Sequence, residues 1–393
     1  KKKIDELVSN QIENEGEVEV TPDRKRAIEN KLTQENQEMA EEAAKPILEF
    51  DMSPKEVKEH IDKYVIGQEQ GKKVMATAIS YHYKRLSKAL REEINENGFN
   101  IDKALKNIKT PKANIMLIGP SGCGKTYTCE VASEIVGVPF VIEDMTKFSE
   151  TGYVGMNVSD ILVDLIMQAD GNPYLAQMGI VYLDEIDKNA SSNVAGRDVS
   201  GQGVQNNLLK IVEGVENNIQ YGMQKLKLST KNVLFIGGGA YEGLDRIIDV
   251  RMYKEQIEGD WKNNIHVEDL EKYGMERQLL GRFPVKVVYD NLTAKNLEDI
   301  MHKSENSPLK AYIEDMKAWN IDLKLSNNAI KTIAEYAERE RIGARGLTSV
   351  LEKVLIDDKY GWPKQKTGEL NVDKKYVLGR IDKNGKISKF KQN

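Results

Sequence analysis

The sequence is poor in the residues that build disulfide frameworks and metal centres. Among 393 residues only Cys123 and Cys129 are cysteines, and their separation fits neither a CxxC pair nor a zinc-ligand spacing. The four histidines are scattered and form no H-E-x-x-H pair. These shortages argue against a disulfide scaffold and against a metalloenzyme. They favour a reducing compartment, which we expect to be the cytoplasm.

Long apolar runs and an excess of positive charge are also missing. Nowhere do 18 consecutive apolar residues occur, and no apolar stretch follows the Lys1–Lys3 start, so we expect neither a membrane span nor a signal peptide. Lys and Arg total 57 against 62 Asp and Glu, which leaves a net charge of −5. Because binding to a phosphate backbone needs a basic surface, nucleic acid is not the expected partner.

The remaining composition is that of an ordinary globular protein. Hydrophobic residues make up 40% of the chain and charged residues 30%, and its length favours two or three domains. Residues 1–50 are rich in Glu, Gln, Asn and Lys, which predicts a charged extension that is a solvated helix or a flexible arm. A helix N-cap and proline from Ser53 mark the start of a folded domain, placed at 51–290.

Within 51–290 short apolar runs alternate with helical patterns. Apolar runs of this kind are typical of strands buried on both faces, and helices between them make the sheet mostly parallel. We therefore expect an α/β fold with a doubly wound sheet. After residue 290 helical periodicity prevails, which predicts a smaller, mainly helical domain with a C-terminal tail at 291–393. The expected strands are Ile115–Ile118, Val138–Ile142, Ile180–Leu183, Val233–Ile236 and Val285–Tyr289.

Two internal segments have the composition of exposed loops. Asn189–Gly203 is full of Ser, Asn and Gly, and Met252–Lys272 is charged without a clear period. We expect neither segment to contain regular structure.

The most specific motif follows the first expected strand and precedes a helical pattern. It matches G-x-x-x-x-G-K-[ST], whose glycines let backbone N–H groups surround phosphates while the lysine meets the β and γ phosphates and the hydroxyl ligates Mg²⁺. An ordinary glycine-rich turn is the less favoured alternative. Its cysteine is read as a small tolerated residue rather than a reactive thiol. ATP and Mg²⁺ are expected at Gly119, Pro120, Ser121, Gly122, Cys123, Gly124, Lys125, Thr126 and Tyr127.

A second motif is an apolar strand that ends in two acids. Asp184 at the carboxyl end of Ile180–Leu183 is placed to hold Mg²⁺, and Glu185 to polarise the attacking water. Alone the pair is more simply a solvated strand end, but its position 59 residues after Lys125, with one strand pattern between, favours the catalytic role. We interpret Asp187 as an acid at a helix start.

Six motifs follow one another in the order found in a known family. They are Tyr64–Gln70, Gly119–Thr126, Gly152–Gly155, Val181–Lys188, Arg197–Gly201 and Gly281–Val285. Through them the chain resembles the AAA+ ATPases and, within these, the ClpX family of ring-shaped protein unfoldases. The resemblance covers about Ser53 to Ile356.

The resemblance implies roles for residues whose function the local sequence pattern does not indicate. Tyr64, Val65 and Ile66 match the adenine-side wall, although a short buried strand is the alternative. Arg282 matches the arginine finger that reaches the γ-phosphate of a neighbouring subunit, where otherwise it would be read as a capping or surface residue. Arg345 matches the sensor-2 arginine. The implied assembly is a homo-oligomer, a hexameric ring that acts on protein substrates.

A loop at the centre of that ring is implied as well. In the family, Gly152, Tyr153, Val154 and Gly155 match a mobile pore loop whose aromatic-aliphatic pair grips unfolding polypeptide through sequence-independent apolar contact. A simple turn with one tucked side chain is the alternative. Asn189–Gly203 corresponds in position to a second pore loop, with a composition that predicts weak grip.

Two departures from the family concern partners. The sequence has no cysteines near its start that could form the family's zinc-binding domain. Between Arg251 and Lys272 it also has no Ile-Gly-Phe tripeptide of the kind that docks on the peptidase ClpP, which puts a ClpP-type partner in doubt. Besides an unfoldase, a protease-independent remodeller of one complex stays open, and a nucleic-acid motor or loader is a weaker alternative.

Overall fold

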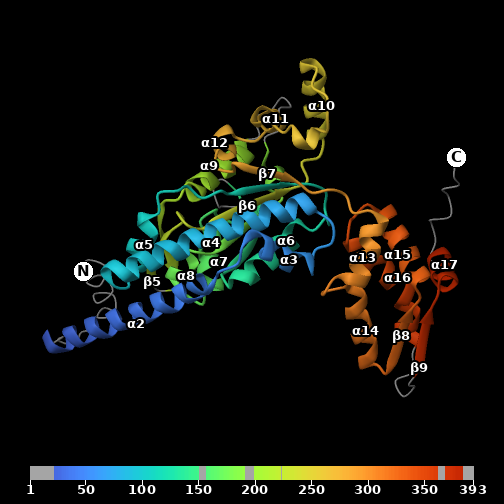
Figure 1. Ribbon diagram of the computed structural model, residues 1–393, viewed down its shortest axis with the longest axis horizontal. Helices are drawn as coiled ribbons and strands as arrows, with labels where there is room; N and C mark the ends of the chain where they lie inside the picture. Colours follow the sequence, from blue (N-terminus) through green and yellow to red (C-terminus); the bar gives the residue numbers. More distant parts are fainter. Residues whose placement is uncertain (1–21, 150–155, 191–198, 223, 362–367, 384–393) are drawn as a thin grey trace.

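A computed structural model describes residues 22–149, 156–190, 199–222, 224–361 and 368–383 of the chain (Figure 1). None of the helices in these ranges combines the length and apolarity that crossing a bilayer requires.

A five-stranded sheet with the order β2-β3-β6-β1-β7 lies at the centre of the larger part of the molecule. All four strand pairs are parallel, which confirms the expected α/β class. Every residue of β1 and of β6 is buried because helices cover both faces of the sheet. The strands are β1 (Ile115–Ile118), β2 (Phe140–Asp144), β3 (Ile180–Asp184), β6 (Leu234–Gly239) and β7 (Val285–Val288).

Successive side chains of β1 enter two separate cores. Ile115 and Leu117 pack on one face, whereas Met116 and Ile118 pack on the other. The helices of the first face are α3 (Pro54–Asp62), α4 (Glu69–Asn97), α5 (Ile101–Asn107) and α6 (Lys125–Val136). The helices of the second face are α7 (Asp160–Gln168), α9 (Val199–Val212), α10 (Leu244–Glu255), α11 (Val267–Tyr273) and α12 (Arg277–Leu280). The short helix α8 (Pro173–Ala176) joins the edges of both cores.

The first described helix, α2 (Pro22–Glu49), confirms the helical form of the expected N-terminal extension, but only its first part is solvated. Its C-terminal half is buried through Ala43, Ala44 and Ile47, which belong to the first core. The side-chain amide of Asn172 also donates to the Met39 carbonyl oxygen over 2.8 Å. Composition alone did not indicate this contact, because alanines make up much of the buried face of α2.

Both expected loops contain helix among the described residues. Helix α9 starts at Val199, inside the segment expected to be irregular up to Gly203. The segment Met252–Lys272 contains the end of α10, the 3₁₀ turn η3 (Trp261–Asn263) and most of α11. The buried Arg251 organises it by ion-pairing with the fully buried Asp269, with Nε–Oδ1 at 2.8 Å. Two further 3₁₀ turns are η1 (Met145–Lys147) and η2 (Ile186–Asn189).

The sequence also failed to predict a hairpin of mostly polar strands. Strands β4 (Glu216–Tyr221) and β5 (Gln224–Ser229) pair antiparallel with each other and join no other sheet. Only Ile219 and Leu228 are buried in them, so the apolar alternation is too sparse to detect.

Residues after 290 build a third core at one end of the molecule (Figure 1). Its helices confirm the expected helical region, but a parallel pair of strands was not predicted. The elements are α13 (Ala294–Lys303), α14 (Pro308–Ala318), β8 (Ile321–Leu325), α15 (Asn327–Glu340), α16 (Arg345–Gly361), β9 (Gly368–Val372) and α17 (Lys374–Lys383).

Candidate active site

The glycine-rich loop spans the gap between β1 and α6 at the carboxyl edge of the sheet. It begins with a hydrogen bond from the Gly119 N–H to the Gly239 carbonyl oxygen at 3.0 Å. Gly122 and Gly124 have φ of 72° and 98°, a left-handed conformation that favours glycine. The loop therefore leads directly into the N-terminus of α6, where free backbone N–H groups favour an anion.

The Lys125 side chain is buried inside the curve of this loop. Its Nζ donates to the carbonyl oxygens of Gly119 at 2.6 Å and Pro120 at 2.9 Å. The ammonium group is thus held beside the N-terminus of α6, as phosphate binding requires. Burial raises the pKa of the Cys123 thiol, which agrees with its interpretation as an unreactive residue.

Thr126 and Asp184 both lie near the hydroxyl group of Tyr182. That hydroxyl donates to Asp184 Oδ1 at 3.3 Å, and the Thr126 side chain lies close enough to it to affect the pKa of Tyr182. The arrangement needs Gly238, because a Cβ there would lie 1.9 Å from the Tyr182 oxygen. A hydroxyl and a carboxylate side by side are the hard oxygen donors that Mg²⁺ prefers, so these residues fit the metal.

Glu185 follows with its side chain exposed at the same edge. Its N–H donates to Asp184 Oδ1 at 3.0 Å, and its φ of 54° is left-handed, which is uncommon for a residue with a side chain. Such strain is retained where the surrounding structure fixes it, and it is common at functional sites. Asp187 lies in the first turn of η2, as expected, and its Oδ2 accepts from the Tyr241 N–H at 3.0 Å.

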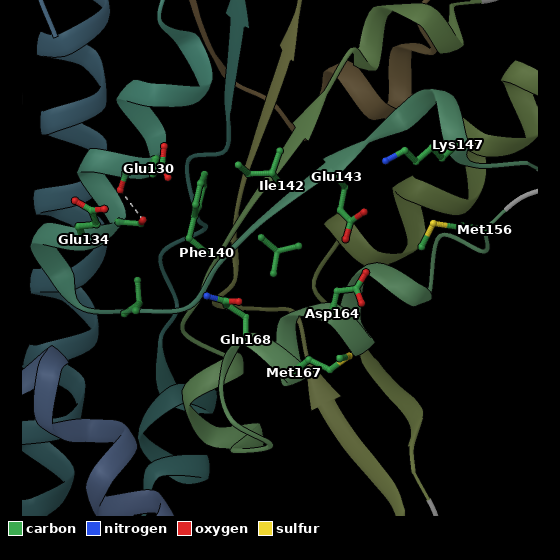
Figure 2. Close-up of a pocket in the computed structure, with 13 residues that line it drawn as sticks. Glu130, Glu134, Phe140, Ile142, Glu143, Lys147, Met156, Asp164, Met167 and Gln168 are labelled. Atoms are coloured by element: carbon green, nitrogen blue, oxygen red, sulfur yellow. Dashed lines mark hydrogen bonds between the residues drawn. The ribbon is translucent and has the colours of Figure 1, made fainter. Parts of the chain in front are cut away.

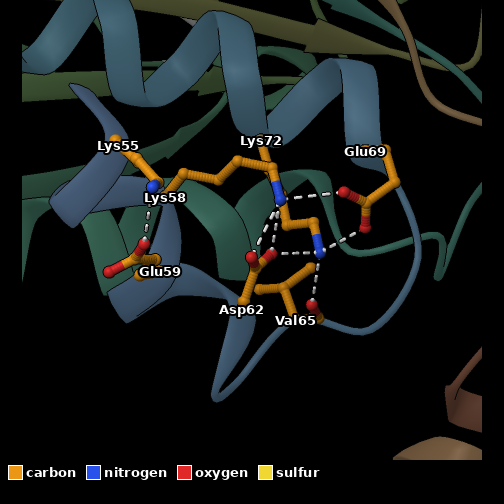
Figure 3. Close-up of polar contacts among 7 residues, drawn as sticks. All are labelled: Lys55, Lys58, Glu59, Asp62, Val65, Glu69 and Lys72. Atoms are coloured by element: carbon orange, nitrogen blue, oxygen red, sulfur yellow. Dashed lines mark hydrogen bonds and ion pairs between the residues drawn. The ribbon is translucent and has the colours of Figure 1, made fainter.

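The segment Tyr64–Ile66 forms a turn rather than a strand, and it lies beside the loop. A Cβ on Gly124 would lie 3.8 Å from a methyl group of the buried Val65. Figure 3 shows how the turn is fixed: the buried Lys72 donates to the Val65 carbonyl oxygen at 3.1 Å and pairs with Asp62 at 2.5 Å. Burial opposes ionisation of Asp62, but hydrogen bonds from Lys58 and Lys72 lower its pKa overall. The network therefore holds the turn against the glycine-rich loop.

The region after residue 290 reaches the loop through the residues before α16. The Ala344 N–H donates to the Gly122 carbonyl oxygen at 2.9 Å, and an Arg345 guanidinium N–H donates to Ser121 Oγ at 3.3 Å. The Asn306 amide likewise donates to the Tyr127 hydroxyl at 3.0 Å. Arg345 is thus brought to the site.

Arg282 is not brought to the site. It precedes β7, whose Val285 and Val288 stand beside Ile115 and Ile118 of the parallel β1. The glycine-rich loop follows the last residue of β1, so Arg282 lies at the opposite, amino edge of the sheet. There it pairs with Glu213 at 2.7 Å, with about half of its side chain exposed.

Two contributions to the site escaped the sequence analysis. The Gln68 amide donates to the carbonyl oxygens of Cys123 at 3.1 Å and Asp290 at 2.8 Å, which ties together segments far apart in the chain. Gly238 makes room for Tyr182, and the unusual run of three glycines at the end of a strand was a signal for it. The expected pore-loop residues Gly152–Gly155 lie outside the described residues.

The amino-acid sequence of this chain is similar to one family profile and to several known proteins. The sequence profile of the AAA domain (Cdc48 subfamily) matches residues 110–286. The ATP-dependent Clp protease ATP-binding subunit ClpX of Treponema denticola is 37% identical over 359 residues, which cover 85% of this chain and 83% of that protein. Proteins of the same name from Borrelia duttonii and Borrelia recurrentis are each 39% identical over 335 residues, 80% of this chain and 75% of theirs. The similarity thus extends over most of each chain.

Proposed function

The chain belongs to the ClpX family of AAA+ ATPases, and from this premise we propose that it unfolds or remodels proteins. In this proposal ATP hydrolysis drives a hexameric ring that pulls polypeptide through an axial pore. The observation that carries the proposal is the placement of Arg282 on the opposite side of the sheet from Lys125. An arginine finger so placed serves only a site on another subunit, and a closed ring supplies one to every subunit.

The chemistry follows from groups at the carboxyl edge of the sheet. Lys125 and the loop amides bind phosphate, and Thr126 and Asp184 hold Mg²⁺, which when bound neutralises phosphate charge. The exposed carboxylate of Glu185 orients the attacking water and accepts its proton. Arg282 of the adjacent subunit stabilises the charge that develops on the γ-phosphate.

We propose that nucleotide state moves two domains against each other. The proposed nucleotide-binding domain, 51–290, and the proposed small domain, 291–393, meet where Ala344 and Arg345 contact Gly122 and Ser121. A phosphate in the loop adds an anionic partner for Arg345, so its loss on hydrolysis weakens that contact. We further propose a cytoplasmic location, supported by the free thiols of both cysteines.

The unfolding activity itself is tested at the proposed pore loop. Tyr153→Ala is expected to leave basal ATPase activity within about twofold of the parent while abolishing ATP-dependent unfolding of a fluorescent substrate, because the apolar grip is lost. Tyr253→Ala is the matched control, since Tyr253 is 87% exposed on α10 and contributes to no proposed site. Unfolding at the parent rate by Tyr153→Ala would contradict the pore-loop assignment.

A remodeller without a peptidase is the favoured form of this function. The relatives are, by name, subunits of a protease. In this chain, however, the segment after α10 offers no free apolar tripeptide. Trp261, the one aromatic residue in it that could replace the tripeptide, packs against the second core instead. The exposed aromatic of this region is Tyr253 of α10, which is followed by Lys254 and Glu255 and lies one helical turn from the exposed Val250. A nucleic-acid motor stays the weaker alternative, and nucleic-acid-stimulated ATPase activity would favour it.

We therefore expect no stable complex with a ClpP-type peptidase. Docking of a ring relies on several weak apolar contacts acting together, so removing the anchor from every subunit removes the combined affinity. The measurement is co-sedimentation of Glu185→Gln protein with such a peptidase in ATP. A stable complex that Tyr253→Ala disrupts would refute the expectation and identify the anchor.

A further inference from the structure

Strand β2 is an edge strand whose outer side is available for pairing. The Ile180 N–H donates to the Pro139 carbonyl oxygen, which sets the ladder so that Val141 and Glu143 bond to β3. By alternation, the N–H and C=O of Ile142 point away from the sheet. No backbone hydrogen bond among the described residues occupies them. Proteins normally cover or charge such an edge, because it pairs readily with another strand.

A groove of about 680 Å³ runs along this edge between α6 and α7 (Figure 2). On its floor the apolar side chain of Ile142 is 48% exposed, and Met167 on the α7 wall is 58% exposed. The size is in the range of ligand grooves, and two exposed large apolar side chains in one groove form a site for apolar contact. The groove is thus both an open edge and an apolar surface.

The charge of the groove is strongly one-sided. Four carboxylate side chains line it and only one cation, Lys147, does so. Figure 2 shows Glu143 and Asp164 directed toward each other, and Glu143 is only 6% exposed. Neither of these two carboxylates forms an ion pair with a cation in the described part of the chain, so a cation from outside has two acidic groups to join. The other two carboxylates are Glu130 and Glu134 of α6.

We propose that this groove docks an extended segment of a partner protein in which lysine or arginine alternates with apolar residues, and that the segment adds as a strand to β2. Strand addition uses the outward N–H and C=O of Ile142 for affinity. Apolar side chains of the segment contact Ile142 and Met167, and a basic side chain lies between Glu143 and Asp164. The excess of carboxylates selects against an acidic segment.

The groove adjoins the proposed pore loop. Lys147 and Met156 line the groove and also flank residues 150–155, and a backbone bridge joins Phe148 to Met156. This link to the pore rests on the proposed function. If Arg282 acts on the neighbouring subunit, subunits meet through the amino and carboxyl edges of the sheet, so the outer side of β2 faces neither neighbour. A docked segment would thus be held beside the pore entrance of its own subunit.

The test measures binding of a labelled peptide to full-length Glu185→Gln protein in ATP and Mg²⁺ by fluorescence anisotropy. The probe is a capped nine-residue peptide that alternates lysine with isoleucine, and the matched peptide carries glutamate in place of lysine. Saturable binding of the lysine peptide, at least tenfold tighter than the glutamate peptide, is expected. Absence of saturable binding, or equal binding of both peptides, overturns the proposal.

Two pairs of variants separate strand addition from simple charge attraction. Ile142→Pro removes the outward N–H of an edge strand together with the isoleucine side chain, whereas Ile142→Val keeps the N–H and a branched apolar side chain. We expect at least tenfold weaker binding for the first and unchanged binding for the second. Glu134→Lys is expected to weaken binding several-fold, while Glu314→Lys, a charge reversal on the exposed surface of α14, leaves it unchanged. Equal affinity within either pair contradicts the proposed docking mode.

Changes in folding or assembly are measured separately from peptide binding. Circular dichroism checks that Ile142→Pro folds, and if it does not, the Glu134→Lys pair still decides. Light scattering reports assembly, and loss of assembly in Glu134→Lys would show that the groove is a contact between subunits, which overturns the proposal. ATPase activity of each groove variant in the otherwise unaltered chain is expected to equal that of the parent. If the proposed function is wrong but the groove still docks a segment, the lysine peptide binds as expected, whereas Tyr153→Ala has no effect on unfolding.

The acidic pair adds a pH dependence to the same binding. Burial, and next the neighbouring Asp164, raise the pKa of Glu143 to about 7, while Lys147 of η1 acts in the opposite direction and Asp160 of α7 adds to the rise. A basic side chain between Glu143 and Asp164 replaces the proton held there below neutral pH. Binding is therefore expected to be tighter at pH 8 than at pH 6, and Glu143→Gln is expected to abolish this difference. A pH difference that persists in Glu143→Gln contradicts this placement of the basic side chain.

Discussion

Replacement of Glu185 by Gln is expected to lower the rate of ATP hydrolysis by about 100-fold or more while ATP still binds. General-base assistance typically contributes ~10²–10⁴ to a rate, and glutamine keeps the shape of the side chain without its basicity. The backbone of Glu185, not its exposed carboxylate, makes the hydrogen bond to Asp184, so the metal-binding edge stays intact. Single-turnover hydrolysis and equilibrium nucleotide binding are the two measurements.

The matched control is Glu242→Gln, an exposed glutamate shortly after β6 that carries no proposed role. Its hydrolysis rate is expected to equal that of the parent. If Glu185→Gln loses nucleotide binding as much as hydrolysis, the residue is structural and not catalytic. If binding survives, we expect the same variant to retain bound protein substrates, and their identification would name what the proposed ring acts on.

Arg282→Ala is expected to reduce hydrolysis by a comparable or larger factor, although Arg282 lies far from the nucleotide loop of its own chain. An arginine supplied by a neighbouring subunit is typically worth ~10³–10⁵ in rate. The control is Glu213→Ala, which removes the ion-pair partner of Arg282 at 2.7 Å and leaves the guanidinium free. A structural role predicts equal losses in both variants, whereas a catalytic role predicts a loss for Arg282→Ala alone.

Mixing of two inactive variants tests whether the arginine acts between subunits. Arg282→Ala subunits keep a sound nucleotide loop, and Lys125→Ala subunits keep a sound arginine. Mixed assemblies are expected to regain ATPase activity at junctions that combine the two. Mixtures no more active than either variant alone would contradict the assignment.

The central sheet and the nucleotide loop could be predicted because their signals are local. Ile115–Ile118 is a continuous apolar run, and the loop motif follows it directly. The packing of α2 could not be predicted, because Ala43 and Ala44 carry little apolar signal and their partners lie elsewhere in the chain. The hydrogen bond between Arg345 and Ser121 joins residues 224 positions apart, so no pattern in either segment contains it.

The edge position of β2, on which the groove depends, could not be predicted from the sequence. The apolar run that predicts this strand ends at Ile142 and thus excludes Glu143, and nothing in the run shows that the strand lies at an edge. The order of strands in a sheet depends on the fold of the whole chain. The residues of one strand therefore do not show whether it lies at the centre or at the edge of the sheet. The packing of the partly buried Trp261 is likewise not visible in the sequence, since it depends on where the turn η3 folds back onto the second core.

The contact between Gly122 and Gly343 has a mechanical consequence. A Cβ on Gly122 would lie 2.1 Å from the Ile342 oxygen, and one on Gly343 would lie 2.3 Å from the Gly122 oxygen. The two segments therefore touch backbone to backbone, with no side chain between them that could change rotamer and absorb a displacement. We therefore expect a shift of the phosphate-binding loop either to move the C-terminal helices with it or to break the Ala344 hydrogen bond. A contact with these two outcomes is either made or broken, with no graded state between, which fits the proposed coupling of nucleotide state to domain movement.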